Sequence, residues 1–337
     1  MVKGVRAKKH YTIPVFIPHE ACPFKCIFCD QEKITGKMNI PGGEEIQGTI
    51  TRNLSTFSPG AEAEVGFFGG TFTGLSLSRQ KSYLDLVLPF IEEGRISGIR
   101  LSTRPDYIDR EKLSFLKQYP VRTIELGAQS FDEEVLKRSF RGHTASDTIN
   151  ASRMIVEYGF SLGLQMMVGL PGDSEEKVQN TAATIVSLGA SEARIYPVLV
   201  IRGTALEKMY RSGEYQPLSL EDAVRWTAPA VEELERAGVK IIRIGLHSSD
   251  TLADHGYVAG PVHPSLRELV MTAIWKKRFS PLFNHAGDIL IRVNPADLNN
   301  AVGYYGWNKK ALQSHYNMVK FLADPEISLN TYHADHH

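Results

Sequence analysis

Short apolar runs alternate with longer amphipathic stretches along the first two hundred residues of the chain. The apolar runs are six to nine residues long. Such runs, bounded by Gly, Pro and polar residues, are typical of buried β-strands. They predict six strands, at residues 13–18, 64–70, 98–105, 123–130, 162–170 and 193–201.

The stretches between these runs predict α-helices at residues 78–94, 131–142, 145–159 and 174–189. Several begin with Asp or Ser, which cap helix N-termini, and stop at Gly. A further helix at 219–238 and an apolar run at 239–246 complete the core. Strands that alternate with helices form right-handed βαβ units around a parallel sheet. We therefore predict an α/β fold, a partial (β/α)6 TIM-like barrel with its site at the carboxyl ends of the strands.

The pattern divides the chain into two predicted parts. Residues 1–246 form the barrel core with a short basic N-terminal arm, and residues 247–337 form a small α/β accessory region. The accessory region has a predicted helix near 265–277, a strand at 288–295 and a helix near 308–322. We expect the final HADHH segment to be a mobile tail and not a metal site.

Composition is that of an enzyme of the cytoplasm. The 337 residues are 42% apolar and 23% charged, so the chain can bury a large core. The formal net charge is zero, so no overall field attracts nucleic acid or a membrane. No run approaches the roughly 18 consecutive apolar residues of a membrane span. The basic start, MVKGVRAKKH, lacks the apolar region of a signal peptide, and we expect a reducing cytoplasmic setting.

The three cysteines of the chain, Cys22, Cys26 and Cys29, all fall within eight residues. The spacing C-x-x-x-C-x-x-C lets three thiolates from one loop bind three corners of a 4Fe-4S cluster, whose full ligation takes four. The fourth iron then keeps an open position where a substrate or cofactor can bind and react. Three alternatives stay open: a zinc site completed by a histidine such as His19, a ferredoxin-like cluster with a non-cysteine fourth ligand, and three unrelated thiols.

Polar or glycine-rich residues gather at the ends of four predicted strands. They include Gly69, Gly70, Thr71, Ser102, Gln129, Arg141 and Gln165. Glycine at such a place lets the backbone approach a ligand without a Cβ in the way. Each group also has a simpler interpretation: paired glycines are compatible with a tight turn, and Arg104 could pair with Asp106.

The cysteine spacing, with the aromatic Phe28 just before the last cysteine, resembles the signature of the radical S-adenosylmethionine (SAM) superfamily. The resemblance implies a 4Fe-4S cluster on the three cysteines, with SAM chelating the open iron. An external ferredoxin or flavodoxin type reductant would supply the electron that cleaves SAM to a 5′-deoxyadenosyl radical. It also implies that SAM is bound by the strand-end residues, namely Gly69, Gly70, Thr71, Ser102, Gln129, Arg141 and Gln165, with Phe28 beside the adenine.

A set of short strings in order resembles one branch of that superfamily, the catalytic subunit of the Elongator complex. The strings are GGTF, TRPD, E-x-G-x-Q-S followed by RGHT, GLPG, IYPVLVIRGT, and RIGLHSSD continuing to HPSLRELV. That family modifies the wobble uridine of tRNA and carries an acetyltransferase-like domain. The resemblance implies tRNA as a partner, and we expect the acetyltransferase domain to be absent from these 337 residues. Whether a separate acyltransferase acts in trans stays open.

Three hypotheses of function follow. The first is a radical enzyme that acts on RNA. The second is a radical enzyme that acts on a small molecule, for which oxygen-independent coproporphyrinogen oxidase is the nearest analogue. The third is a non-catalytic iron-sulfur protein, which the polar groups at the strand ends disfavour.

The segment GYYGWNKK, at 303–310, interleaves aromatic and cationic side chains in a way that can stack bases and hold phosphates. Further cations lie at the N-terminus, at Lys3, Arg6, Lys8, Lys9 and His10. On charge alone we favour a solvated basic tail and an aromatic turn that packs in the core.

Overall fold

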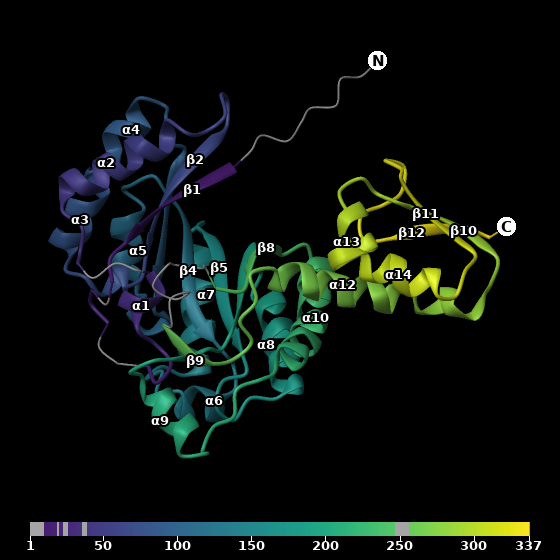
Figure 1. The fold of residues 1–337 in the computed structure, drawn as a ribbon. Helices are drawn as coiled ribbons and strands as arrows, with labels where there is room; N and C mark the ends of the chain where they lie inside the picture. The colour runs from purple at the N-terminus through teal and green to yellow at the C-terminus, as the bar shows by residue number, and fades with distance from the viewer. Residues whose placement is uncertain (1–9, 19, 23–25, 36–38, 247–255, 337) are drawn as a thin grey trace.

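The computed structural model describes residues 10–18, 20–22, 26–35, 39–246 and 256–336 (Figure 1). Several positions named from the sequence lie outside these ranges. They are the basic residues Lys3, Arg6, Lys8 and Lys9, the alternative metal ligand His19, and the HSSD part of the late Elongator-like string.

A single parallel sheet of seven strands, in chain order β1-β2-β3-β4-β5-β6-β8, forms the centre of the molecule (Figure 1). This confirms the predicted α/β partial barrel, and the run at 239–246 adds a strand to the six that the count implied. β1 and β8 are the two edges of the sheet. The strands are β1 (His10–Phe16), β2 (Glu62–Phe68), β3 (Gly98–Thr103), β4 (Val121–Gln129), β5 (Ser161–Val168), β6 (Glu192–Pro197) and β8 (Lys240–Ile244).

Helices follow the strands and cover the outside of the sheet (Figure 1). The predicted helix at 78–94 is divided in two at Leu86 and Val87. The helices of the barrel are α1 (Gln31–Thr35), α2 (Gly43–Leu54), α3 (Leu77–Asp85), α4 (Leu88–Glu92), α5 (Arg110–Leu116), α6 (Glu133–Arg138), α7 (Ala145–Glu157), α8 (Glu175–Ser187), α9 (Ala205–Arg211) and α10 (Leu220–Arg236).

Local capping explains where most of these helices begin. The side chain before the first helical turn accepts a backbone N–H, which is worth about 1 kcal/mol per helix. At α7 the cap is a full capping box, since Asp147 also accepts the N–H of Thr144. The other capping residues are Ser76, Asp109, Asp132, Ser174, Thr204 and Ser219.

The two faces of the sheet differ in chemistry because side chains alternate along each strand. One face is apolar and buried, with Val65, Ile99, Ile124 and Ile195 among its members. The opposite, inner face carries a layer of buried charges. Arg100 lies at its centre, with its Nε 2.7 Å from Glu64 Oε1 and its Nη1 3.0 Å from Glu125 Oε1.

The charge layer extends along the inner face from β2 to β6. Arg100 also contacts Glu192, and Arg194 Nε donates to Glu125 Oε2 at 2.6 Å. Because each carboxylate has a cationic partner, the layer can be buried without leaving an isolated charge. The inner face of the sheet is therefore polar, and its charged side chains are held by one another.

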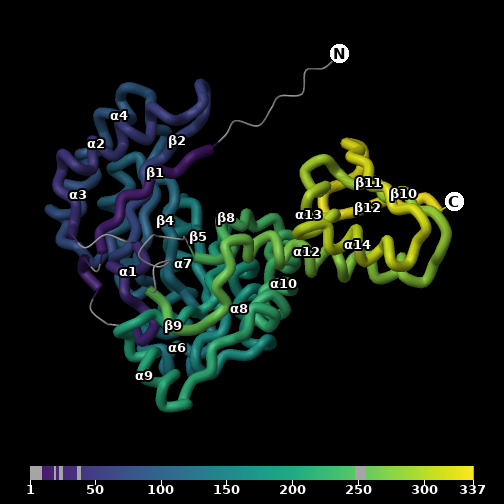
Figure 2. Tube along the Cα trace, in the orientation of Figure 1, coloured from purple at the N-terminus to yellow at the C-terminus, as the bar shows by residue number. Residues whose placement is uncertain are grey.

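The C-terminal residues form a smaller unit that lies to one side of the barrel and joins it through α12 (Figure 2). Helix α12 (Leu266–Arg278) packs on α10, as the hydrophobic core runs from one part into the other. The unit has a three-stranded sheet in the order β11-β10-β12. Its elements are β10 (Asp288–Val293), α13 (Leu298–Val302), α14 (Trp307–Gln313), β11 (Met318–Ala323) and β12 (Tyr332–His336). The domain boundary at residue 246 stays a prediction.

Two expectations about this unit were wrong. The helix predicted near 308–322 ends at Gln313, and the next apolar residues form β11. The final segment, expected to be mobile, forms β12 up to His336. Both strands pair with β10, one parallel and one antiparallel, and Asp335 accepts from Arg292 Nε at 3.0 Å. Both segments form strands because β10, the central strand of this sheet, pairs with one of them along each of its two edges.

Among the described residues, no helix is both long enough and apolar enough to cross a membrane.

Arg100→Met tests the charge layer. Without its cation, the carboxylates of Glu64, Glu125 and Glu192 stay buried together, so we expect the free energy of unfolding to fall by about 3–5 kcal/mol. Equilibrium unfolding in urea measures this change. The control is Arg122→Met, which breaks an exposed pair with Glu62 and should change the free energy by less than about 1 kcal/mol. Equal effects of the two substitutions would contradict this account of the inner face.

Candidate functional site

The three cysteines lie in the loop between β1 and α1, at the carboxyl end of the first strand. The backbone of the loop is fixed on two sides by segments far away in the sequence. Ile27 donates its N–H to Ser139 O at 3.4 Å and accepts from Leu206 N at 2.8 Å. A turn closes the loop, since Cys29 N donates to Cys26 O at 3.1 Å. The loop between the second and third cysteines is thus held by backbone hydrogen bonds.

Each sulfur has a polar neighbour from a different element. Cys22 Sγ lies 3.2 Å from Thr71 Oγ1. Arg141 Nη1 donates to Cys26 Sγ at 3.1 Å, and Gln31 Nε2 donates to Cys29 Sγ at 3.4 Å. Hydrogen bonds to the ligand sulfurs are among the features that tune iron-sulfur clusters. Such polar neighbours suit thiolates better than three unrelated buried thiols.

Burial, with a smaller effect of the neighbouring Cys26 and Cys22 thiols, raises the pKa of the Cys29 thiol to about 12, against the lowering effect of Gln31 and Arg141. A thiol with so high a pKa becomes a metal ligand only when the metal itself stabilises the thiolate. Among the described residues, no three Cys, His, Asp or Glu side chains surround one point where a single ion would sit. The fit to a cluster therefore rests on the polar groups around the sulfurs.

The paired glycines after β2 lie against the segment that leads into the cysteines. A Cβ at Gly70 would lie 2.7 Å from both Ile17 O and Glu20 O. Thr71 N donates to Glu20 O at 3.0 Å, which ties the two loops together. Gly70 therefore has a packing reason to be glycine, in addition to the SAM contact that we predicted for it.

Two more predicted residues, Gln129 and Arg141, have side chains that lie close to Gly127. Arg141 Nη2 donates to Gly127 O at 2.7 Å, and a Cβ on Gly127 would lie only 2.9 Å from Gln129 Nε2. Gln129 is buried at the end of β4 with a positive φ of 67°, and it accepts from Gln165 Nε2 at 3.0 Å. The structure thus brings Gln129, Arg141 and Gln165 together.

The next two predicted residues are Ser102 and Phe28. Ser102 is half-buried on β3, in register with Glu125. Phe28 is buried in an apolar cluster with Cys26, Val135 and Met167. The predicted contact of Phe28 with adenine stays a prediction.

Arg104 forms the ion pair that the simpler interpretation of TRPD anticipated. Its Nε donates to Asp106 Oδ1 at 3.0 Å, and its Nη2 donates to Oδ2 at 2.9 Å. This guanidinium and Asp106 are bound to each other in the structure.

Sequence reasoning missed two residues of this site, Gly127 and His143. Both stand in the quoted strings, in E-x-G-x-Q-S and in RGHT, but neither was singled out. Burial, followed by the charges of Arg141 and Arg104, lowers the pKa of His143 to about 3, so its ring is neutral. His143 Nδ1 and Arg141 Nε are both buried without a hydrogen-bond partner in the described part of the chain. These two atoms are unused polar groups of the RGHT segment.

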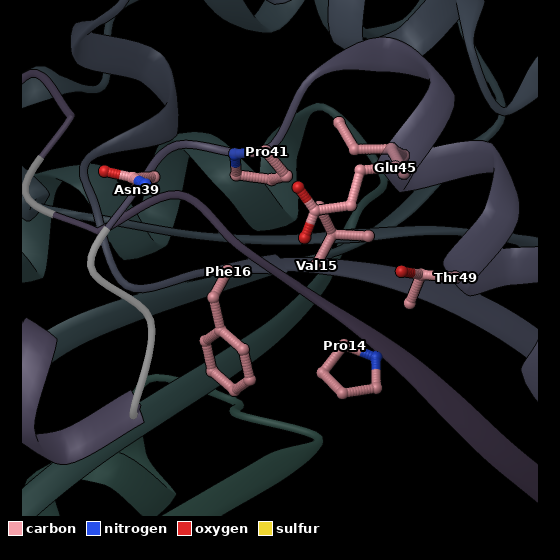
Figure 3. Close-up of a pocket in the computed structure, with 8 residues that line it drawn as sticks. Pro14, Val15, Phe16, Asn39, Pro41, Glu45 and Thr49 are labelled. Atoms are coloured by element: carbon pink, nitrogen blue, oxygen red, sulfur yellow. The ribbon is translucent and has the colours of Figure 1, made fainter.

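Two small pockets lie elsewhere on the barrel. One has a volume of about 50 Å³ and lies between β1, the 39–41 segment and α2. Figure 3 shows the residues that line it. The other, of about 220 Å³, lies at the GLPG turn beside Tyr215 and Trp226. Both are smaller than the roughly 300–1,000 Å³ of a ligand pocket, and neither is lined by a residue predicted to bind the cofactor.

Two family models match the chain. Residues 16–185 match the model of the radical SAM superfamily, and residues 190–276 match that of the radical SAM C-terminal domain. The first match includes all three cysteines and every residue predicted to bind SAM.

Two relatives show the range of similarity. An uncharacterized protein of Methanocaldococcus jannaschii is 30% identical over 248 residues, which covers 68% of this chain and 76% of that protein. A tRNA uridine(34) acetyltransferase of Methanocaldococcus infernus is 26% identical over 262 residues, or 66% of this chain and 48% of that protein. The chain therefore spans about half the length of this acetyltransferase.

A solved structure supports the fold. The archaeal Methanocaldococcus infernus Elp3, with an N-terminal deletion, superposes with a TM-score of 0.67 at 24% identity. The match covers 80% of this chain and 63% of that chain.

Gly70→Ala tests whether the loop before Cys22 depends on this glycine. The added Cβ would meet two backbone carbonyls at 2.7 Å, so the loop must shift and we expect a clear loss of cluster binding. Iron content and visible absorbance after anaerobic reconstitution measure this loss. The control is Gly42→Ala, where the added Cβ has nothing within 4 Å. Full iron incorporation by the Gly70 variant would show that the loop does not depend on this contact.

Proposed function

Because the chain belongs to the radical SAM superfamily, we propose that it is a radical enzyme whose substrate is tRNA, modified at or near the wobble uridine. Membership makes it an enzyme that uses a 4Fe-4S cluster and SAM and that needs a one-electron donor. The observation that carries the radical chemistry is the cysteine loop, in which each of three sulfurs has its own polar neighbour.

Cys22, Cys26 and Cys29 are the residues that would hold the cluster. When bound, the cluster and SAM together supply a 5′-deoxyadenosyl radical by one-electron cleavage of SAM. The loop keeps the middle cysteine buried, and Arg141, Thr71 and Gln31 place their polar groups at the sulfurs. Their role is to hold the ligands and to balance the charge of the thiolates.

The SAM contacts are proposals built on the group around Gly127. Arg141 is buried, donates to Cys26 and Gly127, and keeps its Nε without a partner in the described residues. A guanidinium has five N–H donors, so Arg141 retains capacity for an acceptor such as the SAM carboxylate. The linked amides of Gln129 and Gln165 suit the ribose hydroxyls, and Gly69, Gly70 and Thr71 with Ser102 and Phe28 complete the proposed site.

The tRNA substrate rests on the relatives. The match to a tRNA uridine(34) acetyltransferase covers 66% of this chain but only 48% of that protein. Since the chain spans about half of that relative, the activity of the whole relative does not transfer directly. A radical step on tRNA is the part of the activity that a radical SAM domain can supply, and the source of any acyl group is a separate question.

Anaerobic cleavage of SAM, with and without bulk tRNA, tests the substrate. Reconstituted protein, SAM and dithionite are combined, and 5′-deoxyadenosine is quantified by chromatography. We expect tRNA to stimulate its formation, because a bound substrate orders the site and excludes water. Duplex DNA of equal phosphate concentration is the control for charge alone. Cleavage that is indifferent to tRNA would contradict the proposed substrate and direct the search to a small molecule, whereas no cleavage at all would contradict the radical chemistry.

Arg141→Ala tests the proposed carboxylate contact. Loss of a charge-assisted hydrogen bond of about 1.5–3 kcal/mol should weaken SAM binding by about 10- to 150-fold. Equilibrium dialysis with labelled SAM measures the affinity per assembled cluster, so that any loss of iron is counted separately. Arg153→Ala, on the exposed side of α7, is the control. An unchanged affinity per cluster would rule out this role for Arg141.

A further inference from the structure

The GYYGW turn of the C-terminal unit holds an aromatic cluster made of His263, Tyr304, Tyr305 and Trp307. The ring centroids of Tyr304 and Tyr305 are 4.4 Å apart, and those of Tyr304 and Trp307 are 5.4 Å apart, both in edge-to-face arrangements. His263 contacts Tyr304 edge-on at 5.5 Å. Tyr304 is therefore the centre of the cluster, with the other three rings around it.

The cluster faces solvent, so the favoured interpretation of a core-packing turn was wrong for its outer rings. Tyr305 is 75% exposed and Trp307 is 50% exposed. Among the Phe, Tyr and Trp side chains that the structure describes, the only other exposed one is Phe140, which is on the barrel. Aromatic side chains bury large apolar areas when they find a partner, so two exposed together indicate a binding surface.

The backbone of the turn is held in the conformation that exposes these rings. Tyr305 has a positive φ of 48°, which is unusual for a bulky residue and strained unless its surroundings fix it. Thr272 Oγ1 accepts from Tyr304 N at 2.7 Å, and the buried Asn308 donates to Thr272 O at 3.1 Å. At Gly303, where φ is 84°, a Cβ would lie 3.0 Å from Thr272 Cγ2. The rings are thus presented by a fixed turn and not by a flexible loop.

The chemistry around the rings suits a base with an attached phosphate. Lys309 and Lys310 follow Trp307 in the first turn of α14, whereas the charged side chain of α12 whose field acts on Tyr304 is Glu268. His263 Nδ1 accepts the backbone N–H of Ser265 at 3.0 Å, so Nε2 is the ring nitrogen that remains for a ligand. Stacking on an aromatic face is worth about 1–3 kcal/mol per base and tolerates any base, while nearby cations hold the backbone.

We infer that this aromatic cluster stacks unpaired bases of an RNA and forms a second RNA contact, in the C-terminal unit, away from the cysteine loop. The inference rests on the proposed function, since it takes tRNA as the substrate. RNA is favoured over a protein partner because exposed rings and lysines are interleaved over a few residues, which matches single-stranded RNA recognition.

Trp307 provides a direct signal for such stacking. The chain has three tryptophans. Trp275 is fully buried and the indole N–H of Trp226 is buried, whereas Trp307 is half exposed. We expect titration of the full chain with an unmodified tRNA transcript, or with single-stranded oligouridylate, to quench tryptophan fluorescence. The quenching should be absent in Trp307→Phe, which keeps a ring for binding.

Affinity measurements on ring-deletion variants complete the test. Tyr305→Ala and Trp307→Ala should each weaken RNA binding by about 5- to 150-fold, and Trp307→Phe should weaken it less. The salt dependence should stay the same, because no charge is removed. Met318→Ala, which removes an exposed apolar side chain from β11 of the same unit, is the control and should bind as the wild type does.

The outcomes separate this inference from the proposed function. If the wild type binds tRNA and both alanine variants bind equally well without quenching, the cluster is not a stacking site and the proposed function stands. If the wild type binds no RNA, both are overturned. If the alanine variants instead abolish a concentration-dependent self-association, seen by sedimentation, the cluster is a contact between copies of the chain and the inference is overturned.

Discussion

Two backbone carbonyls, those of Ile17 and Glu20, occupy the space where a side chain at position 70 would begin. This contact brings the loop after β1 against the loop after β2, and Thr71 N closes it with a hydrogen bond. Thr71 then reaches Cys22, so one close backbone approach places the first cysteine. The other two cysteines depend on similar long-range restraints at Ile27, and the cofactor site depends on all of them.

The inner face of the sheet explains why the site can be polar in a buried place. Beneath the strand ends, Arg100 and Arg194 bind carboxylates from three strands, so the charges are paired below the site. Nearer the carboxyl end of β4, the side chains of Arg141 and Gln129 both lie close to Gly127, where a Cβ would be in their way. The inner face thus has paired charges from β2 to β6, and Arg141 Nε, a buried donor without a partner in the described residues, lies near the carboxyl end of β4.

The sequence was sufficient to predict the elements that depend on residues close together in the chain. Short apolar runs and capping residues were enough for the strands and most helices of the barrel, and three cysteines in eight residues marked the site. Features that depend on distant partners were missed. Met318–Ala323 and the final segment form strands because each pairs with one edge of β10. Gly127 was missed because its role depends on Arg141, which donates to its carbonyl from a distant part of the chain. Tyr305 was expected in the core, since no pattern in the sequence reports that Thr272 and Asn308 hold its turn outward.

Electron paramagnetic resonance of the reduced cluster, recorded with and without SAM, tests the central claim most directly. That claim is that three cysteines hold a 4Fe-4S cluster with one open iron. The account predicts that saturating SAM changes the spectrum of the reduced wild-type protein, because SAM binds the iron that no cysteine occupies. A cluster signal that SAM leaves unchanged would contradict the account, since it would mean that no iron is open to the cofactor.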